Sequence, residues 1–302
     1  MRLTRKQFLK AGSILTGGII LQGNSILSKL QEKNNNFRLL RDNFGVYTER
    51  GGTIAFYATD DTVIVIDSQF PDTAKNFMDS LKAVTARKID LLMNTHHHTD
   101  HTSGNIYLKD YSKMMAAHEN CVALQKKFYG NNPDKPQAYA GITFADEWTI
   151  DLGKEKIRAK HFGPGHTGGD AVIHFQNSNI VHMGDLVFNQ IYPYLDGPGG
   201  SSLKGWISVL EMVLSEFGKD TLFVFGHGAE PDLVKGSLND LIAMKDYLSA
   251  LTDFVSKEIK NGRSKEQVLS ATEIPNTRNI KEQREGMRKM NLEFAYNELS
   301  QK

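Results

Sequence analysis

The chain has 302 residues, of which 40% are hydrophobic, and its formal net charge is +1. A chain of this length can bury a large core in one or two domains. The balanced charge, with no basic stripe, argues against a protein that binds nucleic acid. The single cysteine, Cys121, excludes a disulfide within the chain.

The N-terminus combines a basic start, residues 4–10, with a short and weakly apolar stretch, residues 11–21. This order is typical of a signal peptide, and the apolar part is too short to anchor the chain across a membrane. It resembles a twin-arginine export signal in which Lys6 replaces the second arginine. We predict a signal peptide over residues 1–30, an exported or periplasmic location and no stable membrane anchor. The alternative is a frayed helix on a cytoplasmic protein.

The next part of the chain alternates strand-like and helix-like patterns. Residues 31–36 are polar enough to be a linker, so we expect the globular part to open near Phe37. Short apolar runs rich in β-branched residues predict strands, and a proline in the first turn marks a helix. The expected elements are strands at 45–47, 53–58 and 62–66, a helix at 71–86, a strand at 89–93 and a second strand and helix from Lys113.

A second group of strands, over residues 147–183, precedes a helix at 203–216 and a strand at 221–225. This half repeats the element order of the first. Two β-rich halves, each covered by helices, predict an α/β protein with a four-layer αββα sandwich over residues 37–232. Residues 233–302 then form a helical extension, which either covers the sandwich or shares in a substrate pocket or a dimer interface.

The most informative motif follows the predicted strand at 89–93. The run from Thr95 to His101 contains His96, His98, Asp100 and His101 in the order H-x-H-x-D-H. Neutral imidazole and carboxylate are natural ligands of zinc, and a catalytic zinc site leaves one coordination position open for water. A loop with four such side chains indicates a metal centre.

Three further side chains of this kind, His166, Asp185 and His227, each follow a predicted strand. Glycines flank all three, as expected where a loop turns sharply and the backbone passes close to an ion. The ordered set resembles the metallo-β-lactamase superfamily, and most closely its glyoxalase II and lactonase branches.

The resemblance implies the αββα fold and two zinc ions per chain, with iron or manganese less favoured. One ion would be held by His96, His98 and His166, and the second by Asp100, His101 and His227. Asp185 would bridge them, and Asp100 would also serve as a proton acceptor. Water deprotonated between the ions would supply the nucleophile, so no serine or cysteine nucleophile is needed. Cys121, in a predicted helix away from every motif, is expected to be a buried and inert thiol.

Other residues are expected to support the site. In proteins that the chain resembles, an aspartate at the position of Asp67 supports the ligand loop. Residues 188–200 form a long aromatic and glycine-rich loop that either shapes the pocket or is a surface turn, and Tyr192 or Tyr194 could donate to an oxyanion. We expect His97 to point away from the ligands. His118 could reach the site from a strand end, but we expect it to cap a helix or to lie on the surface. His161, His174 and His182 are expected to be structural.

The resemblance favours hydrolysis of a thioester, lactone, ester or amide in a small molecule. Dedicated β-lactamases lack the aspartate found here at Asp185, whereas the predicted export favours a β-lactamase-like enzyme. A second alternative is an iron-dependent oxidoreductase on the same scaffold, although the intact His98 favours zinc. A non-catalytic metal-binding or partner-binding module is least favoured because the ligand set is complete. The sequence predicts no oligomeric state.

Overall fold

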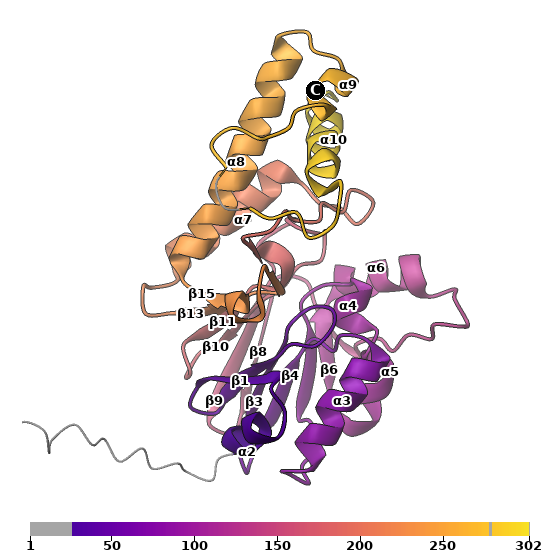
Figure 1. Cartoon of the computed structure of the whole chain (residues 1–302). Helices are drawn as coiled ribbons and strands as arrows, with labels where there is room; N and C mark the ends of the chain where they lie inside the picture. Colours follow the sequence, from indigo (N-terminus) through magenta and orange to yellow (C-terminus); the bar gives the residue numbers. More distant parts are fainter. Residues whose placement is uncertain (1–25, 278–279, 302) are drawn as a thin grey trace, which may run out of the picture.

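The computed structural model describes residues 26–277 and 280–301 (Figure 1). Most of the predicted signal peptide lies outside the described residues. Its last residues, 26–30, belong to helix α2 (Ile26–Lys33). Ile26 and Leu30 are four residues apart on one face of this helix and pack in a core cluster with Phe37 and Phe77. The predicted linker at 31–36 is therefore wrong in part: it begins as the end of a packed helix, and the folded part starts before Phe37.

The first sheet has seven strands that lie side by side in chain order. Strands β1 to β4 pair antiparallel, and β4 to β7 pair parallel. The strands are β1 (Phe37–Arg41), β2 (Phe44–Tyr47), β3 (Ile54–Ala58), β4 (Val63–Ile66), β5 (Leu91–Asn94), β6 (Met115–His118) and β7 (Ile142–Phe144). The helices of this half are α3 (Pro71–Lys82), α4 (Thr99–Thr102), α5 (Asn105–Leu108) and α6 (Glu119–Tyr129), with a 3-10 turn, η1 (Lys109–Tyr111).

The second sheet has six strands in the order β15-β13-β11-β10-β9-β8. They are β8 (Glu147–Leu152), β9 (Glu155–Lys160), β10 (Val172–Phe175), β11 (Ile180–His182), β13 (Leu222–Val224) and β15 (Lys235–Gly236). A small ladder of β12 (Phe188–Asn189) and β14 (His227–Gly228) lies apart from both sheets. The other elements of this half are η2 (Gly184–Leu186), α7 (Leu203–Glu216) and η3 (Pro231–Val234).

Alternating side chains on the strands separate the layers. On β4, Ile64 and Ile66 enter the cluster between the two sheets, whereas Val63 and Val65 enter the cluster that contains Phe77 of α3. Successive strand residues point to opposite faces, so both faces of the sheet are covered. In the second sheet Ile180 faces the first sheet, and its neighbour Val181 joins the cluster of α7. This arrangement confirms the predicted αββα sandwich.

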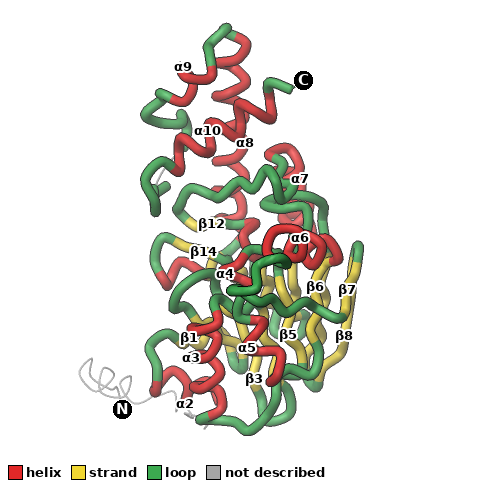
Figure 2. Tube along the Cα trace, turned by 90° about the vertical axis from the view of Figure 1, so that its right-hand side faces the viewer, coloured by secondary structure: helices red, strands yellow, loops and turns green. Residues whose placement is uncertain are grey.

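The predicted helical extension is present as α8 (Leu238–Lys260), α9 (Lys265–Leu269) and α10 (Met287–Leu299), which stack above α7 (Figures 1 and 2). Helix α8 begins at Leu238, later than residue 233, where the helical extension was expected to start. The reason is local: Ser237 and Asp240 form a capping box, and residues 235–236 pair with β13 as β15. Within the described residues, no helix is both long and apolar enough to cross a membrane.

Candidate metal centre

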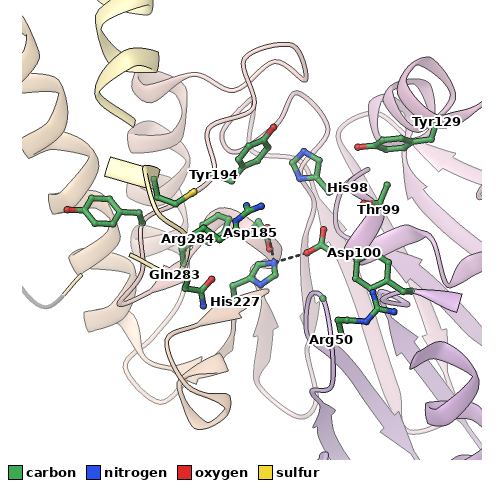
Figure 3. A pocket seen from close by; sticks show the side chains of 15 residues that line it. Arg50, His98, Thr99, Asp100, Tyr129, Asp185, Tyr194, His227, Gln283 and Arg284 are labelled. Carbon is green, nitrogen blue, oxygen red and sulfur yellow. Dashed lines mark ion pairs between the residues drawn. The ribbon is translucent and has the colours of Figure 1, made fainter. Parts of the chain in front are cut away.

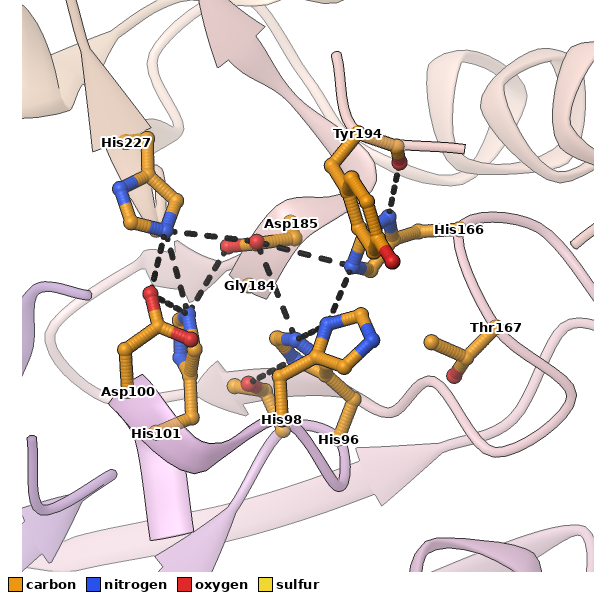
Figure 4. A network of polar contacts seen from close by, with 12 residues as sticks. His96, His98, Asp100, His101, His166, Thr167, Gly184, Asp185, Tyr194 and His227 are labelled. Atoms are coloured by element: carbon orange, nitrogen blue, oxygen red, sulfur yellow. Dashed lines mark hydrogen bonds and ion pairs between the residues drawn. The ribbon is translucent and has the colours of Figure 1, made fainter. Parts of the chain in front are cut away.

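The seven predicted ligand residues lie together at one end of the sandwich (Figure 4). They come from the segments that follow β5, β9, β11 and β13. These segments are far apart in sequence, and the two packed sheets bring them to the same end. The side chains form two clusters with Asp185 between them.

The first cluster consists of three imidazoles. Nδ1 of His98 lies 3.0 Å from Nε2 of His96 and 3.0 Å from Nε2 of His166. Burial lowers the pKa of His96 well below its usual value and that of His166 to about 3. Both rings are therefore neutral near pH 7, and their nitrogen lone pairs are available to a cation.

The second cluster adds a carboxylate. Nε2 of His227 lies 3.1 Å from Oδ2 of Asp100 and 3.4 Å from Nε2 of His101. Burial lowers the pKa of His227, but the charges of Asp185 and Asp100 outweigh it and raise the value to about 10. Burial would raise the pKa of Asp100, yet the facing imidazoles hold it below its usual range. The carboxylates thus create a negative potential that favours positive charge at this point.

Asp185 faces both clusters. Its Oδ1 lies 3.1 Å from Nε2 of His101, and its Oδ2 lies 3.4 Å from Nε2 of His227 and 3.6 Å from Nε2 of His166. The Oδ1 atom is buried and accepts no hydrogen bond. A Cβ atom on Gly226 would lie 1.9 Å from this oxygen, so only glycine leaves room for the carboxylate there.

This donor set fits two divalent cations. One cluster offers three imidazole nitrogens, and the other offers two imidazoles and a carboxylate. The orphaned carboxylate oxygen between them supplies a shared negative charge. Nitrogen and oxygen donors in such numbers suit zinc, which accepts both.

Asp67 and the predicted ligand His101 are joined by a short contact. Oδ2 of Asp67 lies 2.8 Å from Nδ1 of His101, and the same carboxylate accepts hydrogen bonds from the backbone N–H and hydroxyl of Thr95. Asp67 is fully buried and has a φ of 63°. Since Nδ1 of His101 is occupied in this way, Nε2 is the nitrogen that faces the second cluster.

Sequence reasoning missed Asp196. Its Oδ2 lies 2.9 Å from Nε2 of His98, while Nδ1 of the same ring meets the other imidazoles of the first cluster. The carboxylate also accepts a hydrogen bond from the backbone of Gly199. The Asp-Gly-Pro-Gly run marks a turn, but no sequence pattern indicates that this turn touches a residue so distant in the chain.

His97 belongs to neither ligand cluster. Its ring is buried and stacks on Phe128, with the centroids 5.5 Å apart, and its Nε2 lies 3.4 Å from Oδ2 of Asp196. His118 caps α6 as expected, because its Nδ1 accepts the backbone N–H of Asn120.

A cavity of about 850 Å³ opens onto the second cluster (Figure 3). Both predicted loop tyrosines, Tyr192 and Tyr194, line it. The extension also contributes to its wall, through Gln283, Arg284 and Met287. The extension therefore both covers α7 and forms part of the pocket, two roles that the sequence left open.

The model of the metallo-β-lactamase superfamily matches residues 47–227. The chain is 30% identical to a protein of Methanocaldococcus jannaschii named "Probable metallo-hydrolase", over 55% of this chain and 82% of that one. It is 23% identical to a type 2 metallo-β-lactamase of Elizabethkingia meningoseptica, over 72% and 86%.

Solved structures agree on the fold. A metallo-β-lactamase from Pontibacter korlensis superposes with a TM-score of 0.61 at 17% identity, covering 70% of this chain and 98% of that chain. A double mutant of a sec-alkyl sulfatase reaches a TM-score of 0.68 at 11% identity, and the likeness covers 90% of this chain and 51% of that chain. The chain therefore belongs to the metallo-β-lactamase superfamily and is a metal-dependent hydrolase.

Proposed function

We propose that this protein uses two zinc ions to hydrolyse an acyl bond, in a thioester, lactone, ester or amide, of a small molecule. The observation that carries the proposal is the position of the Asp185 carboxylate between the two clusters of predicted ligands. Its Oδ1 lies 3.1 Å from Nε2 of His101, and its Oδ2 lies 3.4 Å from Nε2 of His227 and 3.6 Å from Nε2 of His166. His96, His98 and His166 would hold one ion, and Asp100, His101 and His227 the other. Paired ions of this kind acidify water and polarise a carbonyl oxygen.

The residues around the ions would orient the reactants. Asp100 presents its carboxylate to the cavity and is held ionised by His101 and His227. A carboxylate with a lowered pKa is a weak base, so we propose that Asp100 chiefly orients water through a hydrogen bond.

Tyr194 is the better placed of the two loop tyrosines. Its ring lies next to His98, with the centroids 5.5 Å apart, and its backbone oxygen lies 2.9 Å from Nδ1 of His166. Tyr192 instead packs edge-on against Tyr247. We therefore assign to Tyr194 the donation of a hydrogen bond to the carbonyl oxygen under attack.

The alternative is a β-lactamase. Relatives in Elizabethkingia meningoseptica and Pseudomonas aeruginosa carry that name, at 23% and 27% identity. Against it stands Asp185, because dedicated β-lactamases lack an aspartate at this position. An iron-dependent oxidoreductase is disfavoured by the three imidazoles of the first cluster, which suit zinc.

One experiment separates these functions. The purified protein is analysed for bound metals and assayed with S-lactoylglutathione, an acyl-homoserine lactone, a simple aryl ester and nitrocefin. We expect close to two zinc ions per chain and faster turnover of the first three compounds than of nitrocefin. Preference for nitrocefin would establish the β-lactamase alternative, and a protein without bound or activating metal would overturn both.

We also propose that the protein is exported, on the basis of the basic start and the short apolar stretch at residues 11–21. Cell fractionation of the full chain, with a variant in which Arg5 and Lys6 are both replaced by Gln, tests this. Equal cytoplasmic retention of both forms would contradict it.

A further inference from the structure

Among the described residues, Arg284 is the pocket-lining arginine without a carboxylate partner. Two arginines line the cavity, Arg50 and Arg284. Arg50 is already neutralised, because its guanidinium lies 2.5 Å and 2.6 Å from the two carboxylate oxygens of Asp72 and covers the ring of Phe70. Arg284 forms no ion pair with any residue in the part of the chain that the structure describes.

The backbone around Arg284 is fixed to the loops of the metal centre. The backbone N–H of Lys281 donates to the oxygen of Gln190, and that of Tyr192 donates to the oxygen of Lys281. The side-chain amide of Gln283 donates to the oxygen of Gly228, next to the ligand His227. On the other side, Met287 is buried at the start of α10. The arginine is therefore held at a set place in the wall.

The direction of the side chain matches a role in binding. Figure 3 shows Arg284 reaching from the extension toward the space beside Asp185 and His227, across the cavity from Arg50. A guanidinium offers paired N–H donors in a planar fork, which matches a carboxylate. Arg284 lies outside residues 47–227, the part that matches the superfamily model.

Resting on the proposed function, we propose that Arg284 binds a carboxylate of the substrate that is remote from the scissile acyl bond. The substrate class is then an acyl compound that carries its own negative charge. The two ions would attract the acyl carbonyl, and Arg284 would fix the other end of the molecule. Neutral acyl compounds of the same length would be poorer substrates.

A matched pair of esters tests this inference: mono-4-nitrophenyl glutarate, which carries a free carboxylate, and 4-nitrophenyl valerate, which is neutral. The zinc-loaded full chain should show the higher kcat/KM with the glutarate ester. In Arg284→Gln that value should fall about 10- to 100-fold, the loss expected for one charge-assisted pair, while the valerate value stays within about threefold. Arg284→Lys should recover part of the loss.

Arg263→Gln is the control, because Arg263 is a cation of the same extension that pairs with Glu258 and does not line the cavity. It should leave both esters unchanged. Equal loss for both esters in Arg284→Gln, or no preference for the glutarate ester in the unaltered protein, would overturn the inference.

A binding measurement keeps the inference testable if neither ester is hydrolysed, a result that would count against the proposed function alone. Calorimetric titration of the zinc-loaded protein with monomethyl glutarate should give a Kd at least about fivefold lower than that of Arg284→Gln. Equal affinities, or no binding to the unaltered protein, would overturn the role of Arg284.

Discussion

Asp196 and His98 form a contact that sets which ring nitrogen of His98 faces the first cluster. The carboxylate occupies Nε2 at 2.9 Å, and Nδ1 is left to meet His96 and His166. Partners of this kind fix the orientation of a ligand ring and raise its basicity. Their loss weakens metal binding without removing a ligand.

We therefore expect Asp196→Asn to lower zinc affinity about 10- to 100-fold at one of the two sites. Competition with a chromophoric chelator measures both affinities, and the d–d spectrum of the cobalt-substituted protein reports on the altered ligand geometry. Asp151→Asn, an exposed carboxylate on β8, is the matched control. Two unchanged affinities in Asp196→Asn would assign Asp196 to the loop structure alone.

Asp185→Asn should reduce metal content and lower kcat/KM by at least about 10- to 100-fold. The amide removes the negative charge shared by the two clusters and places N–H donors against ring nitrogens. Elemental analysis and steady-state kinetics check both effects. Retention of both metals with near-full activity would show that Asp185 does not bridge them.

Asp170, which lies four residues beyond His166, is not a neutral control for that experiment. Its carboxylate is buried and accepts hydrogen bonds from the backbone N–H and hydroxyl of Thr167. Burial raises the pKa of Asp170 to about 7. Asp170→Asn should therefore disturb the loop of His166, and Asp151→Asn is the better control.

The contact of α8 with α7 should contribute much of the stability of the extension. Leu248 is fully buried in their shared cluster, so Leu248→Ala should reduce the free energy of unfolding by about 2–5 kcal/mol. Ile242 lies on the same helix and is 40% exposed. Ile242→Ala should therefore change the free energy of unfolding by less than about 0.5 kcal/mol. Urea unfolding compares the two variants. Equal effects would mean that α8 does not share the core of α7.

The pKa of His118 is lowered by burial from 6.5 to about 4. Its neutral ring accepts the N–H of Asn120, and protonation abolishes that acceptor. The unfolded chain binds a proton at higher pH than the folded chain does. The stabilisation from the neutral ring is thus complete above pH 6.5 and is lost as the pH falls toward 4.

His118→Asn keeps an N-capping oxygen but does not titrate. Between pH 6.5 and 4, the free energy of unfolding of this variant should fall less than that of the unaltered protein. The difference should be about 1–2 kcal/mol after allowance for solvent screening. Thermal unfolding between pH 4 and 7 measures the difference. Parallel curves for the two proteins would contradict the assignment.

Cys121 is buried in α6, and burial raises its pKa well above the usual value. Cys121→Ser should retain its metals and turnover within a few-fold, at a stability cost of about 1–3 kcal/mol for the buried hydroxyl. A thiol reagent should label the native protein slowly and the urea-unfolded protein fast. Loss of a metal in this variant would mean that the ligand sets are drawn wrongly.

The sequence predicted the sandwich because strand alternation and turn residues are local signals. The helix predicted at 203–216 has the same bounds as α7. The H-x-H-x-D-H loop correctly indicated the end of strand β5. The predicted boundaries of elements were wrong where pairing between residues distant in the sequence sets them. Residues 235–236 pair with β13, and Lys281 forms a bridge with Ile191, both inside the region 233–302 that was expected to be helical.

The residues around the predicted metal ligands also divide into those that the sequence indicates and those that only tertiary packing brings to the site. Asp67 could be anticipated from the family resemblance, because it directly follows strand β4, where resembling proteins carry an aspartate that supports the ligand loop. Asp196 and Arg284 could not, because only tertiary packing brings Asp196 against His98 and places Arg284 in the wall of the cavity. Side chains that converge through tertiary packing leave no periodic trace in the chain.

The pocket wall contributed by residues 283–287 separates two tasks along the chain. The seven predicted metal ligands lie before residue 228, and this part of the pocket wall lies more than fifty residues later in the chain. Substitutions or recombination in this short stretch can therefore alter the pocket wall without altering the predicted metal ligands. A library at residues 283, 284 and 287 would therefore test whether substrate preference can be changed while the metal ligands stay unaltered.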